Sequence, residues 1–458
     1  MHDHLPPTPA LKPDMSAELW NSAVRVLETN WAGDHMVPSR RLYPHQWSWD
    51  AAFIAIGLAY VNPTRAWRDL RSLFEAQWPD GRVPHIVFDP ATAEADYFPG
   101  PAFWDVPAYG NRAARGSTGI VQPPMHAIAA WEVYRHAAAH GANCAQEART
   151  ELEWLYPRLV AQQRYLTTDR NLGRGGLASI VHPWESGLDN SPAWDEAMAN
   201  VPADLALLSQ YRRRDLDVSD AAHRPTDLDY SRYVGLVVSY RAEGYADAGL
   251  LDRHAFAVEC PAFNSILASA ELALAQIAGE LGRTAEAATH RHRAAQITAA
   301  IIRRLWNEET GTFHALDVHT GKLTPANCVS GLLPLMLPDL PADLVQAIMN
   351  EMRSNRFGLP VPSYDRTAPD FDTMRYWRGP VWINVNWLVR RGLLMHGFRD
   401  EAEDLRTAMV RLVHRNGHFE YFHPTTGEGL GAPTFSWTAA LSLDLLADRS
   451  VPAYAKAG

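Results

Sequence analysis

The sequence predicts an all-α protein in which roughly a dozen helices, joined by turns and long loops, close into a barrel of helical hairpins. Apolar residues recur at the three- and four-residue spacing of a helix from one end of the chain to the other. Strand signals are short, and they predict isolated β-hairpins within loops rather than a sheet. They lie at residues 85–88, 312–316 and 418–422.

The helical pattern can be followed in order along the chain. The apolar run at 51–61 has the length of a buried helix. Successive helices joined by short turns pack as antiparallel neighbours, which predicts the ring. Amphipathic segments occur at residues 19–27, 266–281, 297–305, 344–352 and 405–412.

Long loops rich in proline, glycine and tryptophan separate the helices, and functional sites usually lie on such loops. No linker divides the chain into two domains. We expect a loosely ordered tail over residues 1–14 and a single barrel domain over 15–450, with 79–120 as a lid or insertion. The loops span residues 30–49, 79–120, 170–195, 211–230, 355–380 and 414–433.

The composition excludes several classes of protein. The net charge is −10 and no basic stripe occurs, so nucleic acid is not an expected partner. No apolar run reaches membrane-spanning length, and the N-terminus lacks the apolar core of a secretion signal. The 3 cysteines have no disulfide or zinc spacing, which favours a reducing, cytoplasmic compartment. His2 and His4 are expected in a disordered tip rather than at a metal, and a homo-oligomer is left open.

Tryptophan is unusually frequent, with 16 residues in the chain. Part of this set fills the core. The rest lies next to Asp, Gln and Gly, which predicts a pocket for a sugar, because indole packs against the C–H face of a sugar ring. Motifs of nucleotide-binding loops, zinc proteases and serine hydrolases are absent. Carboxylates beside aromatics remain, and cleavage of a glycosidic bond needs one protonated and one ionised carboxyl group but no metal or organic cofactor.

Blocks of sequence carry a specific resemblance, in order along most of the chain. The segment HPWESGLDNSPAWD at 182–195 is similar to the ESGWD motif of trehalases. RPTDLDYSRY at 224–233 is similar to a block of the bacterial mannosylglycerate and glucosylglycerate hydrolases. Further blocks are QWSWDAAF at 46–53, RYWRGPVWINVNW at 375–387 and FEYFHPTTGEGLGAPTFSWTAAL at 419–441. Together they resemble glycoside hydrolase family 63, which implies an (α/α)6 barrel and an inverting mechanism.

The resemblance assigns the general acid to Asp189. Gly187 lets the loop turn tightly, and nearby indoles can desolvate the carboxyl group and raise its pKa. The alternative for Asp189 is an Asx-turn. The resemblance assigns the general base to Glu420, with Glu428 in the TGEGLG turn as the alternative. Inversion requires roughly 6.5–9.5 Å between the two carboxyl groups. Asp195 is expected to cap a helix.

The resemblance also implies a sugar subsite. Asp50 could accept from two sugar hydroxyls, with the N-cap of the helix that follows as the alternative. Glu185 either binds sugar hydroxyls or orients its loop. Gly379 would give a ligand room, and core packing is an equal alternative for Trp382. The implied lining is Tyr43, Trp49, Asp50, Gln122, Trp184, Tyr376, Trp377, Gly379 and Trp382.

An organic acid in the leaving group needs a cation, and arginine is the usual planar partner of a carboxylate. Arg224 and Tyr230 match the positions that bind glycerate in the hydrolases that the chain resembles. The alternative for Arg224 is a surface pair with Asp227. One departure from the pattern is Thr434, where glucosylglycerate hydrolases are expected to carry Gln, and it puts the contacts to glycerate in doubt.

The sequence therefore predicts an inverting α-glycosidase that acts on a small α-glucoside or α-mannoside, foremost glucosylglycerate or mannosylglycerate. An α-glucosidase for neutral gluco-oligosaccharides or disaccharides is the alternative within this class. A noncatalytic sugar-binding barrel is the alternative from another class. The acidic run DRTAPDFD at 365–372 suggests isoprenoid chemistry but lacks a close DDxxD motif.

Overall fold

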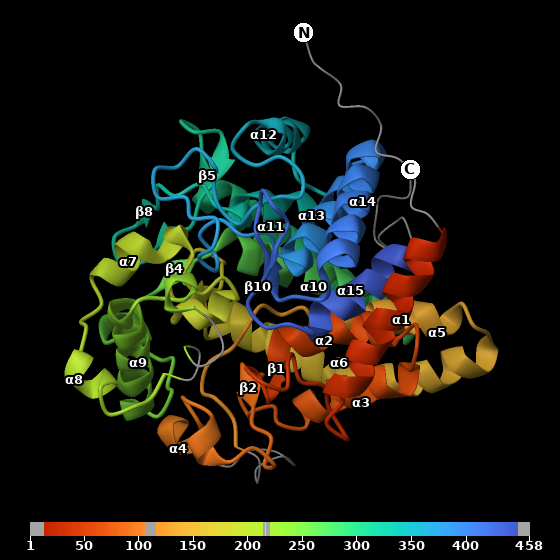
Figure 1. Cartoon of the computed structure of the whole chain (residues 1–458), viewed down its shortest axis with the longest axis horizontal. Helices are drawn as coiled ribbons and strands as arrows, with labels where there is room; N and C mark the ends of the chain where they lie inside the picture. The colour runs from red at the N-terminus through yellow and green to blue at the C-terminus, as the bar shows by residue number, and fades with distance from the viewer. Residues whose placement is uncertain (1–12, 107–115, 214–215, 217–219, 448–458) are drawn as a thin grey trace.

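The computed structural model describes residues 13–106, 116–213, 216 and 220–447. Figure 1 shows α1, α3, α5, α6, α14 and α15 packed together on the right, with the shorter helices α4, α7 and α8 on the left. Most of the expected tail at 1–14, including His2 and His4, and residues 107–115 of the expected lid lie outside the described residues. None of the helices in the described part of the chain is both long and apolar enough to cross a bilayer.

An inner ring of helices forms the barrel wall, and each member packs against the next until α15 closes against α2. All residues of α2 are buried, because this helix is apolar on every side and has neighbours all round. One member, η8, is a 3-10 helix that contains Pro334. In ring order the members are α2 (Ser48–Leu58), α5 (His126–Ala138), α10 (Pro261–Glu280), η8 (Val329–Met336), α13 (Ile383–Met395) and α15 (Ser436–Ala447).

An outer layer of amphipathic helices covers the ring and alternates with it along the chain. Leu344, Ile348 and Met352 form the buried stripe of α12 at the predicted spacing. Each outer helix packs against an inner element that precedes or follows it, apart from α1, which packs against α15 beside α14 (Figure 1). The outer helices are α1 (Pro13–Asn30), α3 (Pro63–Phe74), α6 (Ala142–Thr168), α11 (Thr284–Leu305), α12 (Ala342–Arg353) and α14 (Arg399–Asn416). The predicted ring of helical hairpins is confirmed.

Because inner and outer helices alternate, the inner helices run in the same direction and their N-termini meet at one end of the barrel. The long connections between the barrel helices carry the remaining helices, most of which are short. The expected loop at 211–230 ends early, because a capping box between Thr226 and Asp229 begins α9. These helices are η1 (Glu94–Asp96), α4 (Pro101–Trp104), η3 (Pro183–Ser186), η4 (Pro192–Trp194), α7 (Asp195–Ala199), α8 (Leu205–Leu208), η6 (Ala221–His223), α9 (Asp227–Ala242) and η7 (Leu250–Asp252).

Strands form at the predicted places, but the prediction of hairpins alone is wrong. Antiparallel pairs join β1 (Gln46–Trp47) to β2 (Ile86–Val87), β5 (Trp306–Asn307) to β6 (Thr312–Phe313), and β9 (Tyr421–Phe422) to β10 (Gly429–Leu430). A four-stranded sheet has the order β3 (Ser179–Ile180), β4 (Val258–Glu259), β7 (Leu316–Asp317) and β8 (Lys322–Leu323). Its strands come from distant segments, so local patterns could not reveal the pairing.

A substitution at Gly57 would test how closely the inner helices of the ring pack. Gly57 lies where α2 crosses α15, and an added Cβ would overlap backbone atoms of Ala440. Backbone cannot move aside as a side chain can, so Gly57→Ala should lower the free energy of unfolding by about 2 kcal/mol. Gly279→Ala is the control, because that helical glycine has open space, and it should stabilise by up to about 1 kcal/mol. Equal effects in denaturant titrations would contradict the close crossing.

Candidate active site

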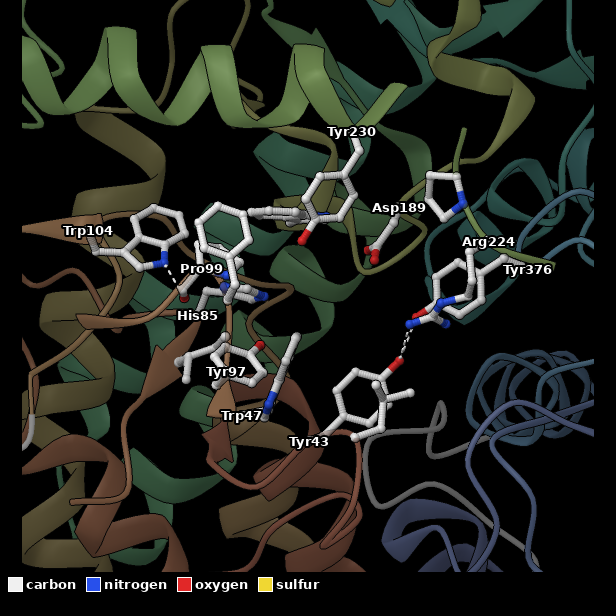
Figure 2. Close-up of a pocket in the computed structure, with 15 residues that line it drawn as sticks. Tyr43, Trp47, His85, Tyr97, Pro99, Trp104, Asp189, Arg224, Tyr230 and Tyr376 are labelled. Atoms are coloured by element: carbon white, nitrogen blue, oxygen red, sulfur yellow. Dashed lines mark hydrogen bonds between the residues drawn. The ribbon is translucent and has the colours of Figure 1, made fainter. Parts of the chain in front are cut away.

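Two adjoining cavities lie at the end of the barrel where the inner helices begin. We call them the inner cavity and the outer cavity. Tyr43, Trp47, Asp189 and Tyr376 line both, so the two form one continuous site. The inner cavity is also lined by Trp49, Asp50, Gln122, Gly187, Trp377, Trp382, Glu420, Phe435 and Trp437. The outer cavity is also lined by Leu42, His85, Ile86, Tyr97, Phe98, Pro99, Trp104, Trp184, Arg224, Pro225 and Tyr230 (Figure 2).

Aromatic rings form the wall of the inner cavity. Trp377 and Trp382 stack with ring centroids 3.8 Å apart and planes 4° apart, and Trp382 packs in turn against Tyr421. Trp49 packs edge-on against Trp437 at 5.6 Å. A wall of indoles excludes water and offers flat surfaces to a ring-shaped ligand. Trp382 therefore both packs in the core and lines the site.

The loop that carries Asp189 turns at Gly187, whose φ of 68° favours glycine. An added Cβ there would come within 2.6 Å of the Trp49 ring, so glycine also lets the loop approach the indole. Tyr233 donates a hydrogen bond to the carbonyl oxygen of Asp189 at 3.1 Å. The Asp189 side chain points into the space between Tyr230 and Arg224 (Figure 2).

The electrostatics of Asp189 favour its protonated form. Burial raises the pKa of the carboxyl group to about 7, the Arg224 guanidinium opposes this increase, and Glu420 adds to it. A carboxyl group with a pKa near neutrality can supply a proton in neutral solution. The physical requirement for a general acid is therefore met at the predicted position.

Glu420 lies immediately before β9 and is 1% exposed. Its Oε1 accepts hydrogen bonds from the hydroxyls of Tyr43 at 2.8 Å and Tyr376 at 3.1 Å, and its Oε2 accepts from the backbone N–H of Ala432 at 3.0 Å. Gly431 has a φ of 70°, and an added Cβ there would meet the carboxylate. These contacts fix the orientation of the carboxylate in the inner cavity.

Burial raises the pKa of Glu420, while the Arg224 guanidinium and three hydrogen-bond donors lower it. The alternative residue, Glu428, lies in the exposed turn between β9 and β10 and is not among the lining residues of either cavity. The geometry therefore favours Glu420 over Glu428 as the carboxylate of the site.

Arg224 is 5% exposed and lines the outer cavity. Its Nη2 donates to the hydroxyl of Tyr43 at 3.0 Å, and its guanidinium lies 4.6 Å from the centre of the Tyr376 ring. Asp227 instead pairs with Arg213 at 2.9 Å. The guanidinium thus faces the cavity and the Tyr43–Glu420 pair rather than solvent. Tyr230 lines the same cavity.

Asp50 does not cap its helix, because α2 already begins at Ser48, after Trp47. Its side chain lines the inner cavity and is 3% exposed. Burial raises its pKa well above the usual value, and the charge of Glu420 raises it further. Gln122 lines the same cavity and accepts from the backbone N–H of Trp49 at 3.1 Å.

The structure corrects the prediction that Glu185 contacts sugar. Its side chain is fully buried and lines neither cavity. Both carboxylate oxygens accept from Arg170, at 2.6 and 2.7 Å, and from backbone N–H groups. A carboxylate with this many protein donors has no face left for a ligand. Glu185 therefore orients the loop, which was the other expectation.

Gly379 also lies outside both linings. An added Cβ there would collide with the carbonyl of Asp372, so the glycine permits a close backbone approach and not ligand entry.

Asp195 is the first residue of α7 and not its cap. Its carboxylate forms a two-point pair with Arg378, at 2.8 and 2.9 Å. Thr434 is exposed and lines neither cavity.

The structure brings the predicted residues Tyr43, Trp49, Gln122, Trp184, Tyr376 and Trp377 to the linings of the two cavities. Several lining residues were not predicted, and many of them come from the loop at 79–106. His85 stacks nearly parallel to Trp184, with centroids 6.2 Å apart. The other unpredicted aromatic residues are Trp47, Tyr97, Phe98, Trp104, Phe435 and Trp437.

Within the described residues, no group of three or more His, Cys, Asp or Glu side chains is arranged as metal ligands. The acidic run at 365–372 makes local contacts instead. Asp365 accepts from Thr367, and Asp370 pairs with Arg378 at 2.7 Å. The run therefore gives no support to the isoprenoid interpretation.

Known proteins share the sequence and the fold of this chain. Residues 43–438 match the family model described as the mannosylglycerate hydrolase MGH1-like glycoside hydrolase domain. The chain is 40% identical over 441 residues to a mannosylglycerate hydrolase of Rubrobacter radiotolerans, covering 94% of this chain and 97% of the other. It is 35% identical over 452 residues to a glucosylglycerate hydrolase of Mycolicibacterium hassiacum, covering 96% and 100%.

Solved structures of known proteins also match the fold of this chain. The GH63 mannosylglycerate hydrolase from Thermus thermophilus in complex with Tris and D-glycerate matches with a TM-score of 0.84 at 37% identity, over 93% of this chain and 99% of the other. Neutral trehalase from Saccharomyces cerevisiae matches at 17% identity with a TM-score of 0.56 and shares the fold.

The fold and the paired carboxyl groups define a glycoside hydrolase on an (α/α)6 barrel, as the sequence predicted. The chain belongs to the MGH1-like glycoside hydrolase family, within GH63.

The pH profile tests the electrostatics of the site. A general acid works only while protonated, so kcat/KM should fall as the pH rises through about 7, the pKa of Asp189 in the free protein. A general base works only while ionised, so kcat/KM should also fall at acid pH, at a value above the usual range of a glutamate. Asp189→Asn should lower kcat by about 10³-fold and remove the alkaline limb. An unchanged profile in that variant would contradict the assignment.

Proposed function

We propose that this chain hydrolyses an α-linked glycosylglycerate, mannosylglycerate or glucosylglycerate, to the free sugar and glycerate with inversion at the anomeric carbon. The observation that carries this proposal is the position of Asp189 at the junction of a carboxylate-bearing aromatic cavity and a cavity that contains a guanidinium. The names of the matched relatives support the same substrates.

In this proposal the sugar occupies the inner cavity. The indole walls pack against the ring, and Asp50 and Gln122 accept from or donate to its hydroxyls. Asp189 donates its proton to the glycosidic oxygen, which leaves with glycerate. Glu420 removes a proton from water as that water attacks the opposite face of the sugar. The network of Tyr43 and Tyr376 orients the Glu420 carboxylate for this step.

Glycerate occupies the outer cavity in this proposal. The guanidinium of Arg224 pairs with the glycerate carboxylate, and Tyr230 closes the opposite side. Among the described lining residues, Arg224 is the only guanidinium or ammonium group. A neutral oligosaccharide would bring no anion to this buried cation, which favours the charged leaving group over the neutral alternative.

We further propose a cytoplasmic location. Cys144, Cys260 and Cys328 are all free thiols, which suits a reducing compartment.

A substrate panel tests the proposed function. Mannosylglycerate, glucosylglycerate, trehalose and a neutral α-gluco-oligosaccharide would be compared by kcat/KM. One of the two glycerate compounds should exceed both neutral sugars by at least about 100-fold, because an Arg–carboxylate pair is lost with the neutral compounds. Preference for trehalose or the oligosaccharide would instead favour the α-glucosidase alternative, and no hydrolysis of any compound would favour a sugar-binding protein.

The role of Arg224 can be isolated by matched substrates. Arg224→Gln should raise KM for the glycosylglycerate by about 10- to 100-fold, the value of a charge-assisted pair. The same variant should change KM much less for the glycoside of glycerol, which lacks only the carboxylate. Arg213→Gln is the matched control, because Arg213 lies against the Tyr230 ring but outside the cavity lining. Equal losses on both substrates would refute the role in glycerate binding.

A further inference from the structure

A row of alternating buried charges lies behind the loop that carries Asp189. Arg170 and Glu185 are both fully buried and form a two-point pair, with Nη1 to Oε2 at 2.7 Å and Nη2 to Oε1 at 2.6 Å. The Arg170 Nε lies 3.0 Å from Oδ1 of Asp247, and the Arg82 Nη2 lies 2.9 Å from its Oδ2. The row thus reads carboxylate, guanidinium, carboxylate, guanidinium.

This row joins two loops that contribute to the site. The Oε2 of Glu185 accepts from the backbone N–H of Val181, just before the turn that leads to Asp189, at 2.7 Å. Its Oε1 accepts from the N–H of Val121 at 3.1 Å, and Val121 precedes Gln122 of the inner cavity. One carboxylate therefore fixes the acid-bearing loop and the Gln122 segment to each other.

Arg82 and Asp247, at the other end of the row, are also held by hydrogen bonds. Arg82 donates to the carbonyl of Tyr245 at 2.9 Å and also to the carbonyl of Gly119 at 2.6 Å. Tyr240 donates to Asp247 at 2.5 Å. Each of the four buried charges is thus paired with an opposite charge and makes further hydrogen bonds, an arrangement that favours one geometry of the network.

Neither Arg170 nor Glu185 lines a cavity. We propose that they are positioning residues, which hold the Asp189 carboxyl group where it can protonate the leaving oxygen. This inference rests on the proposed role of Asp189 as the general acid. The planar guanidinium is essential to it, because lysine keeps the charge but offers no two-point fork to a carboxylate.

The test exploits the leaving group. Glycerate leaves as an alkoxide that needs a proton, whereas fluoride leaves from an α-glycosyl fluoride without one. Arg170→Lys and Glu185→Gln should lower kcat on the glycosylglycerate by about 100-fold, the usual cost of misplacing a catalytic group by an ångström. On the α-glycosyl fluoride of the same sugar, both variants should stay within about threefold of the parent, because proton donation is not used there.

Arg391→Lys is the matched control. Arg391 is also a buried arginine in an ion pair, with Glu132 at 2.9 Å, but it lies in the C-terminal half of α13, away from the cavities. Melting temperatures would be measured for all variants, and rates would be measured well below them. The control should lose stability without favouring one substrate over the other.

Asp189→Asn calibrates the test. If it loses far more on the glycosylglycerate than on the fluoride, Asp189 is the acid, and equal losses on the two substrates in the Arg170 and Glu185 variants would then overturn the positioning role alone. If Asp189→Asn itself shows no such difference, the proposed acid is wrong and the positioning role fails with it. A selective loss in Arg170→Lys and Glu185→Gln, absent from Arg391→Lys, is the predicted result.

Discussion

The burial of three carboxyl groups in one cavity is the constraint on which the rest of the site depends. Asp50, Asp189 and Glu420 share one aromatic cavity, and burial raises the pKa of each of them. Three such groups cannot all be ionised side by side at low cost. The Arg224 guanidinium and the hydroxyl of Tyr43 offset part of that cost near Glu420. Asp189 is left with a pKa near neutrality, which suits it to the role of general acid that we propose, with Glu420 as the base.

The barrel makes this cluster of buried carboxyl groups possible because its packed helices stabilise the fold, whereas the loops at one end carry the residues of the site. The inner helix α2 is buried on all sides, and at Gly57 it packs closely against the backbone of α15. The N-terminal ends of the inner helices and the preceding loops then present side chains from distant parts of the sequence to one cavity. Asp189 and Glu420, more than two hundred residues apart in the chain, meet only because the ring closes.

Sequence alone predicted the helical ring and both carboxyl groups, because periodicity and ordered motifs are local signals. It misassigned Glu185 and Gly379, since a motif shows that a residue is constrained but not whether a ligand or the protein imposes the constraint. Arg170 contacts Glu185 across fifteen residues without any motif of its own, so only the fold could reveal it. The four-stranded sheet and the aromatic residues at 85–104 escaped prediction for the same reason.

In the proposed mechanism, Asp189 and Glu420 act from opposite faces of the sugar in a single displacement. Proton NMR of the first-formed product can test this, because the anomers of the released sugar give separate signals before they interconvert. Inversion requires that the β-anomer of the sugar form first from an α-linked glycosylglycerate and that the α-anomer grow in only by mutarotation. An α-anomer formed first would refute the single displacement.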